Sequence, residues 1–387
     1  MRWAAGASQL ADSGFAAEEA ATRALEGLGP GGVDLAMVFF GAPHVPHASA
    51  LAETLRRVLA PQCLIGASAQ GIVTPEHEIE GGPVVSVLAA RLPGVEMMPF
   101  VVVREAWGQA VHDPLEFARV APGARDAEVL FLISDPFSLP VENVLTAFNR
   151  HAPGVRVVGG MASAGVRPNG NAFVLNDWVS AEGGVGLGLK GALRADVVVS
   201  QGCHPIGPPL EVTRTQGNLL VELDGQPALE RAEQVLRELD DAQRERLRHG
   251  LYIGRPVRAG AHGPGDYLIR NLLGADRDRG LLAIGDRPKR SERVRLHVRD
   301  AASARADLEM LLTPQSVDTP AAVAVMFLCN GRGRGLYGRP DGDLSVLREA
   351  LGEVPAGGMF CAGEFGPLGG PNHLHGHTAS IAILRPA

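Results

Sequence analysis

A glycine-rich loop with two arginines is the segment of this sequence best suited to bind a ligand. The loop, residues 329–335 (Cys-Asn-Gly-Arg-Gly-Arg-Gly), follows an apolar run at 323–328 that is typical of a buried strand. Strand ends in open α/β sheets face the crevice where ligands bind. Glycines let backbone N–H groups approach an anion, and a guanidinium can hold a carboxylate with two hydrogen bonds. We therefore predict ligand contacts from Cys329, Asn330, Gly331, Arg332 and Gly333.

The same loop has an alternative interpretation as a flexible turn whose arginines face solvent. It lacks the G-x-x-x-x-G-K-[ST] pattern of a phosphate-binding loop, so a nucleotide is not implied.

An acidic turn near the C-terminus offers a complementary charge. Glu364 follows Gly363 among apolar residues, where a carboxylate needs a partner such as Arg332 or a ligand ammonium group. Arg332 and Glu364 together would suit the two charged ends of an amino acid. The alternative is a structural salt bridge that fixes the turn to the loop.

Three histidines alternate at positions 373, 375 and 377, which on a strand would place all three rings on one face. Such an arrangement can chelate zinc, but no second group of ligands with suitable spacing accompanies it. We therefore expect no metal and no cofactor. We expect His375 to form hydrogen bonds in a pocket at the strand edge.

A thiol hydrolase or transferase is an alternative function. Cys361, Glu364 and His375 could supply a nucleophile, an orienting acid and a base. However, Cys361 lies in an apolar run, and no G-x-S-x-G motif is present. We expect a binding protein rather than an enzyme, with no catalytic residues. Ser68 and Ser163, in two glycine turns, are expected to hydrogen-bond to a ligand or to the turn itself.

The elements that carry these residues recur three times in the sequence. Each copy predicts a buried strand, a helix, a second strand that ends in a glycine turn, and a further strand. The first strands lie at 33–40, 128–133 and 323–328, and the helices at 48–59, 141–150 and 344–351. The glycine turns lie at 66–71 and 159–165, with the second strand and turn of the third copy together at 358–364, and the further strands lie at 84–90, 183–189 and 378–384. The glycines permit a tight reversal, so the further strand is expected to be antiparallel.

This pattern predicts an α/β or α+β protein with two related domains of mixed sheets flanked by helices. A stretch rich in glycine and proline at 203–209 marks the domain junction. We expect an N-terminal extension at 1–30, one domain at 31–205 and a second at 206–387.

The composition excludes several classes of protein. The chain has 387 residues, 45% of them hydrophobic, and a net charge of −7, a composition that excludes a disordered protein. No apolar run in the sequence is long enough to cross a membrane as a helix. Its arginines are scattered among more numerous acids, so nucleic acid binding is not expected. The four cysteines are far apart and form no C-x-x-C pair, so they should be reduced thiols. The N-terminus lacks a sustained apolar segment, and we expect a cytoplasmic protein.

Several strings in sequence order resemble the FIST proteins, which pair an N-terminal and a C-terminal FIST domain. These strings are Gly-Ala-Ser-Ala-Gln-Gly at 66–71, Pro-Pro-Leu-Glu-Val-Thr at 208–213, Glu-Leu-Asp-Gly-Gln-Pro-Ala-Leu at 222–229, Tyr-Leu-Ile-Arg at 267–270, Cys-Asn-Gly-Arg-Gly at 329–333 and Gly-Glu-Phe-Gly-Pro at 363–367. The resemblance covers about residues 33–384 and implies a sensory or ligand-binding module. The family more often has Gly-Cys-Ser/Thr at the first turn, and Ala67 replaces that cysteine here.

We therefore expect a signal-transduction protein that binds a small polar metabolite, such as an amino acid, in a crevice near 329–335 and 363–366. Ligand binding would favour a closed arrangement of the domains, and the output would pass to a protein signalling partner. The thiol enzyme and a protein-interaction scaffold without a small ligand remain as alternatives.

Overall fold

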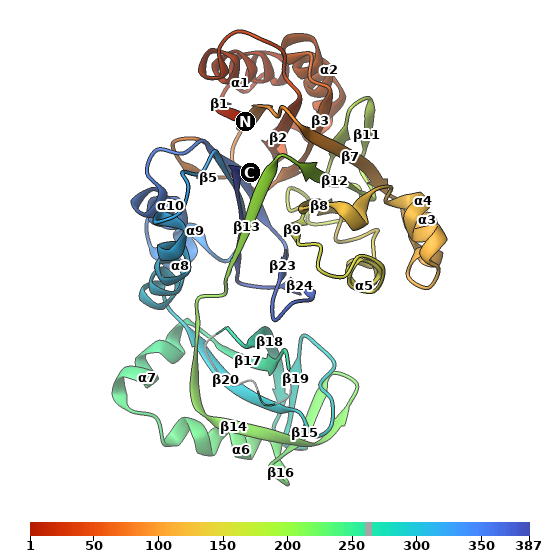
Figure 1. The fold of residues 1–387 in the computed structure, drawn as a ribbon. Helices are drawn as coiled ribbons and strands as arrows, with labels where there is room; N and C mark the ends of the chain where they lie inside the picture. The colour runs from red at the N-terminus through yellow and green to blue at the C-terminus, as the bar shows by residue number, and fades with distance from the viewer. Residues whose placement is uncertain (259, 261–264) are drawn as a thin grey trace. The chain divides into compact units, whose positions relative to one another are not determined.

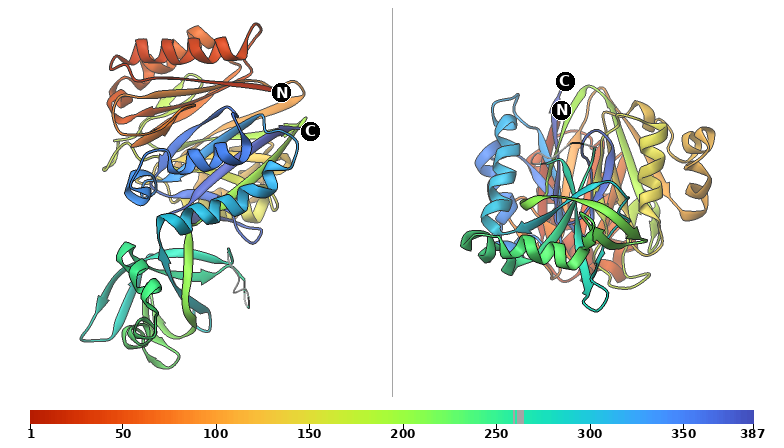
Figure 2. Two further views of the ribbon diagram at one scale, coloured as in Figure 1. Left: turned by 90° about the vertical axis from the view of Figure 1, so that its left-hand side faces the viewer. Right: turned by 90° about the horizontal axis from the view of Figure 1, so that it is seen from below.

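The structure is a computed structural model that describes residues 1–258, 260 and 265–387, apart from the side chains of 242 and 249. The chain is a mixed α/β protein that divides into two compact units (Figures 1 and 2). The first comprises Met1–Val199, Glu309–Leu374 and Thr378–Ala387, and the second comprises Ser200–Leu308 and His375–His377. The chain leaves the first unit at Val199 and returns to it at Glu309.

The first unit consists of three structural repeats, as the sequence predicted. The elements of the first repeat are β1 (Arg2–Ser8), α1 (Ser13–Leu28), β2 (Leu35–Gly41), η1 (Ala42–His47), α2 (Ala48–Leu59), β3 (Cys63–Ala69) and β6 (Val85–Arg91). Those of the second are β7 (Val95–Val102), α3 (Arg104–Ala110), α4 (Pro114–Val120), η2 (Ala124–Asp126), β8 (Val129–Ser134), α5 (Val141–His151), β9 (Val157–Met161) and β12 (Gly184–Gly191). Those of the third are β13 (Leu193–Ser200), α8 (Ala301–Ser316), β21 (Val323–Cys329), α9 (Gly333–Tyr337), α10 (Gly342–Leu351), β22 (Ala356–Cys361) and β25 (Ala379–Pro386).

The pairing of these strands is the same in each repeat. The strand before the predicted helix runs parallel to the strand after it: β2 with β3, β8 with β9 and β21 with β22. The last strand of each repeat is antiparallel to the strand before the helix: β6 pairs with β2, β12 with β8 and β25 with β21. The predicted antiparallel orientation of the last strand is therefore confirmed. The predicted tight reversal after the second strand is wrong, because the last strand pairs with the first strand of the repeat and a separate hairpin lies between. Residues 1–30, expected as an extension, contribute β1 at the edge of the first sheet and α1, which packs on it.

Each repeat also sends a short hairpin into the sheet of another repeat. The hairpins are β4 (Gly71–Val73) with β5 (Glu78–Glu80), β10 (Phe173–Leu175) with β11 (Trp178–Ser180), and β23 (Glu364–Pro367) with β24 (Asn372–His375). The first hairpin joins the third sheet through β22, the second joins the first sheet through β3, and the third joins the second sheet through β9. The exchange is cyclic, so every six-stranded sheet contains strands from two repeats.

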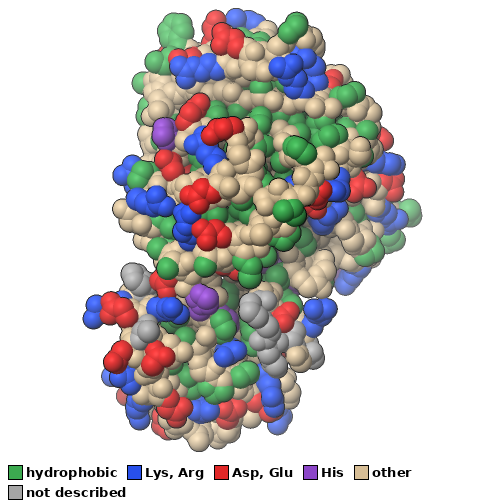
Figure 3. Space-filling view, turned by 60° about the vertical axis from the view of Figure 1, so that its left-hand side comes forward, with side chains coloured by type: hydrophobic (Ala, Val, Ile, Leu, Met, Phe, Trp, Pro, Cys, Tyr) green, Lys and Arg blue, Asp and Glu red, His purple; other side chains and the backbone are tan. Residues whose placement is uncertain are grey.

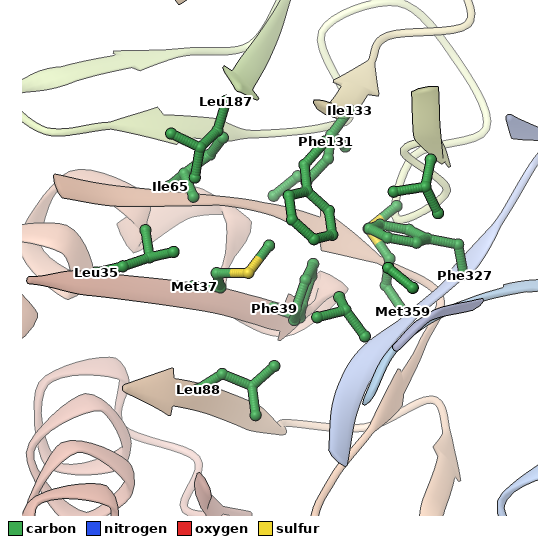
Figure 4. Packing of buried hydrophobic residues seen from close by; sticks show 14 of the residues in the cluster. Leu35, Met37, Phe39, Ile65, Leu88, Phe131, Ile133, Leu187, Phe327 and Met359 are labelled. Atoms are coloured by element: carbon green, nitrogen blue, oxygen red, sulfur yellow. The ribbon is translucent and has the colours of Figure 1, made fainter. Parts of the chain in front are cut away.

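The core of this unit lies between the inner faces of the three sheets. Phe39, Phe131 and Phe327 come from different repeats and point into one apolar cluster (Figure 4). The rings of Phe39 and Phe327 meet edge to face with centroids 6.1 Å apart. The outer sheet faces are covered by helices, α1 and α2 on the first sheet and α3 to α5 on the second.

Three glycines at equivalent positions allow the parallel strands to lie close together. Gly66, Gly159 and Gly358 each face the neighbouring strand, and a Cβ there would lie 1.8 to 1.9 Å from a carbonyl oxygen of that strand. Gly159 and Gly358 also have φ angles of 151° and 157°, which other residues rarely adopt. The prediction that these glycines form turns is therefore wrong: they lie inside β3, β9 and β22, where a side chain would collide with the neighbouring strand.

The second unit is built around antiparallel strands that close into a barrel. Its elements are β14 (Cys203–Gln216), β15 (Leu219–Leu223), β16 (Gln226–Pro227), α6 (Ala228–Arg237), α7 (Asp241–Arg246), η3 (Leu247–His249), β17 (Leu251–Pro256), β18 (Tyr267–Asp276), β19 (Leu281–Ile284) and β20 (Arg293–Arg299). The strand order runs from β14 through β20, β17, β18 and β19 to β15, which pairs again with β14. The barrel has an apolar interior that includes residues of α6.

No helix among the described residues is both long enough and apolar enough to span a membrane. Acidic and basic side chains are interspersed on the face drawn in Figure 3, without a basic stripe.

Candidate functional site

Arg332 of the predicted loop is fully buried and forms an ion pair with Asp343 at the start of α10. Its Nε lies 2.7 Å from Asp343 Oδ2, and its Nη2 lies 2.5 Å from Asp343 Oδ1. The hydroxyl of Tyr337 donates to the same carboxylate at 2.7 Å. Burial opposes the charge of Arg332, but Asp343 and Tyr337 outweigh it and hold the arginine pKa well above its usual value. The solvent-facing alternative is therefore wrong for Arg332, although Arg334 is exposed.

A second buried carboxylate, Glu78, meets this cluster from the exchanged hairpin of the first repeat. Glu78 Oε1 accepts hydrogen bonds from the backbone N–H groups of Asp343 at 2.9 Å and Leu344 at 2.6 Å. It therefore caps α10, whose own N-cap residue, Asp341, does not cap it and instead accepts from the Glu78 N–H. Burial and then the charge of Asp343 raise the pKa of Glu78 to about 8.

Sequence reasoning missed Glu78, Tyr337 and Asp343. The available signal was an aspartate beside glycine at the start of the helix predicted at 344–351, which is typical of a helix N-terminus. No local pattern could have brought Glu78 there, because the contact depends on the hairpin exchange.

The other predicted residues of the loop and turns lie in the same unit. Asn330 donates its backbone N–H to Cys361 O at 2.9 Å, which holds the start of the loop against β22. Glu364 is fully buried, and its Oε2 accepts the backbone N–H of Thr378 at 3.1 Å. Gly363 accepts the N–H of Met161 at 2.8 Å. The sequence analysis named Glu364 as a possible carboxylate partner of Arg332, and the structure pairs Arg332 with the carboxylate of Asp343.

The two predicted serines form hydrogen bonds with backbone groups of other repeats, not with the backbone of their own turns. Ser163 Oγ donates to Phe360 O at 2.7 Å and accepts from the N–H of Gln70 at 3.0 Å. Ser68 Oγ accepts from the N–H of Ala172 at 2.9 Å. These contacts join different repeats to one another.

The predicted alternation of three histidines does not hold. Strand β24 ends at His375, and His377 lies beyond it with φ of 64°. The His377 ring instead meets the Tyr252 ring edge to face, with centroids 4.6 Å apart, and its Nε2 lies 2.5 Å from Asn271 Oδ1. His375 is buried, at 2% exposure. Within the described ranges, no group of three or more His, Cys, Asp or Glu side chains is arranged to hold a metal ion.

Cys361 has the environment of a core residue. It is fully buried, and its Sγ donates to Met359 O at 3.6 Å. Burial, together with the charge of Glu364, raises the pKa of the Cys361 thiol well above its usual value. A thiol in this environment is a poor first nucleophile, which weighs against the thiol hydrolase.

A cavity of about 450 Å³ lies at the end of β8, in the second repeat. This place is equivalent to the predicted loop. Leu132 pairs with Gly159 and Met326 pairs with the equivalent Gly358, and Asp135 and Cys329 each lie three positions further along the chain. Asp135 accepts the N–H groups of Phe137 and Ser138 and the Asn171 side-chain amide, at 2.8 to 3.1 Å. These bonds fix the loop that lines one side of the cavity.

The remaining wall combines charged and aromatic side chains. Arg104 and Glu105 come from the start of α3, and Glu182 follows β11. Within the described part of the chain, none of these three side chains forms a hydrogen bond or ion pair. Trp178 and Phe137 add aromatic surface, with Phe137 42% exposed. The sequence signal available for this site was the loop with Pro136 and Pro140, which follows the strand predicted at 128–133 and corresponds to the loop at 329–335.

The comparisons with known proteins identify the family. Two uncharacterized proteins, from Mycobacterium tuberculosis and Mycobacterium bovis, are each 38% identical over 388 aligned positions, with 99% of this chain and 100% or 99% of each relative covered. A solved cyanuric acid hydrolase from A. caulinodans matches 100% of this chain and 99% of its own at 8% identity and a TM-score of 0.40, which is too low to carry an argument about function. The FIST N domain model matches residues 34–226 and the FIST C domain model matches 228–367. The chain therefore belongs to the FIST family, whose domains are generally sensory and ligand-binding.

Proposed function

We propose that this protein is a sensor that binds a small polar metabolite, with an amino acid as the best fit, in the cavity at the end of β8. The observation that supports the proposal is the combination of unpaired charges of both signs with aromatic surface in one cavity. A volume of about 450 Å³ lies within the range of small-molecule sites.

The charges of the cavity match the two ends of an amino acid. Arg104 would hold the carboxylate, because its planar guanidinium can donate two parallel hydrogen bonds. Glu105 or Glu182 would accept hydrogen bonds from the ammonium group. Trp178 and Phe137 offer apolar surface to a side chain of the ligand.

Ligand binding at this place can reach other parts of the first unit. Trp178 belongs to the β10–β11 hairpin, which pairs with β3 in the sheet of the first repeat. Suppose that the hairpin can take two positions relative to the start of α3. A ligand that contacts both elements would shift the population toward the position in which the cavity has the higher affinity for it. We propose that a protein signalling partner in the cytoplasm detects this change.

The ligand contacts predicted at Cys329 to Gly333, Gly363, Glu364, His375, Ser68 and Ser163 stay predictions. The two-domain division at residues 205 and 206 likewise stays a proposal.

The proposal is tested by thermal denaturation of the full chain with each of the common amino acids at millimolar concentration. A bound ligand raises the melting temperature in proportion to the logarithm of its concentration above Kd. We expect at least one amino acid to stabilise the wild type. Arg104→Ala should bind that ligand at least about tenfold more weakly, since charge-assisted hydrogen bonds contribute about 1.5–3 kcal/mol each.

Arg125→Ala is the matched control, because Arg125 is an exposed arginine of the same repeat that does not line the cavity. It should bind like the wild type. The absence of stabilisation by every amino acid, or equal binding by Arg104→Ala and wild type, would contradict the proposal.

A further inference from the structure

Two cysteines lie side by side at the ends of the central parallel strands of the third repeat. Cys329 is the last residue of β21 and Cys361 is the last residue of β22, and the two are direct partners in the strand register. Both are thiols in this structure. Cys361 is buried, whereas Cys329 is half-buried.

The register brings both side chains to the same face of the sheet. Residues on a strand alternate between faces, and Phe327 and Met359, two positions before the cysteines, belong to the central core with Cys361. Neighbouring strands are about 4.8 Å apart, which lies within the Cα separation that a disulfide requires.

The surroundings of Cys361 keep its sulfur in place. A Cβ built on Gly160 would lie 2.5 Å from Cys361 Sγ, so the neighbouring strand β9 is packed directly against the sulfur. On the other side, Asn330 N–H donates to Cys361 O at 2.9 Å and ties the two strand ends together.

Cys329 has the features of the thiol that reacts first. Its sulfur accepts the backbone N–H of Gly331 at 3.5 Å, and it interacts electrostatically with the Arg332 guanidinium. Cys329 is also the more exposed of the two thiols, so an oxidant reaches it before it reaches Cys361.

We infer that Cys329 and Cys361 form a reversible dithiol–disulfide site that responds to peroxides. The Cys329 thiolate attacks one peroxide oxygen, the O–O bond breaks, and the other oxygen leaves as hydroxide and takes up a proton to become water. The sulfenic acid formed on Cys329 is then attacked by the sulfur of Cys361. The new S–S bond replaces the S–O bond, and the departing hydroxide takes the Cys361 proton as a second water.

The roles of the two thiols follow from their burial. Cys361 is too buried to meet an oxidant first, and burial raises its pKa, so it reacts only with the sulfur beside it. The disulfide would fix the origin of the 329–335 loop, and the site is independent of the cavity at β8.

Hydrogen peroxide treatment of the full chain tests the inference. After treatment, remaining thiols are alkylated, the protein is digested without reductant, and the peptides are identified by mass spectrometry. We expect a peptide containing Cys329 linked to one containing Cys361, and its loss after dithiothreitol. Cys203→Ala is the matched control, because Cys203 is also half-buried, and it should give the same linked peptide.

Cys361→Ala should accumulate sulfinic acid on Cys329 under the same treatment, because the sulfenic acid then has no thiol partner. If this variant does not fold, the presence or absence of the linked peptide in the oxidised wild type is sufficient to test the inference. The inference is overturned if wild-type Cys329 is oxidised to sulfinic acid without the linked peptide, or if Cys329 does not react with peroxide.

Discussion

The buried carboxylate of Glu78 should make stability fall as the pH rises. In the unfolded chain this group has an ordinary pKa near 4.5, and in the folded protein burial and Asp343 raise it to about 8. Between these values the folded protein holds a proton that the unfolded chain has lost. The stabilisation from this proton is complete below pH 4.5 and is lost as the pH rises through 8.

The size of the effect follows from proton linkage. One proton contributes about 1.4 kcal/mol to the free energy of unfolding for each pH unit of the interval. The interval from 4.5 to about 8 therefore corresponds to roughly 3–5 kcal/mol. This is a large part of the 5–15 kcal/mol that holds a typical domain together.

Glu78→Gln isolates this contribution. The amide oxygen can still accept the N–H groups of Asp343 and Leu344, and the side chain stays neutral at every pH. Its free energy of unfolding should equal that of the wild type near pH 5 and exceed it by several kcal/mol at pH 9. Urea denaturation followed by circular dichroism at both pH values measures the difference.

Glu76→Gln is the control, because Glu76 lies exposed in the same hairpin turn. Its free energy of unfolding should differ from that of the wild type by a similar small amount at both pH values. A Glu78→Gln effect that is the same at pH 5 and pH 9 would refute the argument that the buried carboxylate is protonated.

Three further outcomes follow from the contacts. Arg332→Met alone should lower the free energy of unfolding by about 3–5 kcal/mol, because Asp343 stays buried and charged without its partner. Adding Asp343→Leu should restore most of the lost stability, and a double variant no more stable than the single one would contradict this. Gly66→Ala should destabilise the protein by about 3 kcal/mol or more, while Gly32→Ala, where a Cβ meets no atom within 4 Å, should not; equal melting temperatures would contradict this. His297, whose pKa burial lowers to about 4, should show no NMR titration shift between pH 8 and 5.5, and a midpoint near 6.5 would contradict its burial.

The repeats and their strand pairing could be predicted from the sequence because they depend on local patterns. Apolar runs such as 128–133 mark strands covered on both faces, and the glycine-rich strings mark the second strand of each parallel pair. The family could also be identified, because several short motifs occur in a fixed order.

The hairpin exchange and the buried cluster could not be predicted in this way. Glu78 contacts Asp343 across 265 positions of the sequence, and a short charged segment such as 76–80 gives no sign of a buried partner. The histidine pattern failed for a related reason. His377 has a left-handed backbone conformation, so the strand ends before the alternation is complete.

The cyclic exchange of hairpins has a consequence for synthesis on the ribosome. Strand β4, at Gly71–Val73, leaves the exit tunnel early, but its partner β22 ends at Cys361. Until nearly the whole chain has been made, this hairpin has no sheet to join and its apolar residues remain unprotected. Nascent chains are therefore expected to need chaperone protection for most of translation, and C-terminal truncation should leave the earliest-made repeat with an unpaired hairpin.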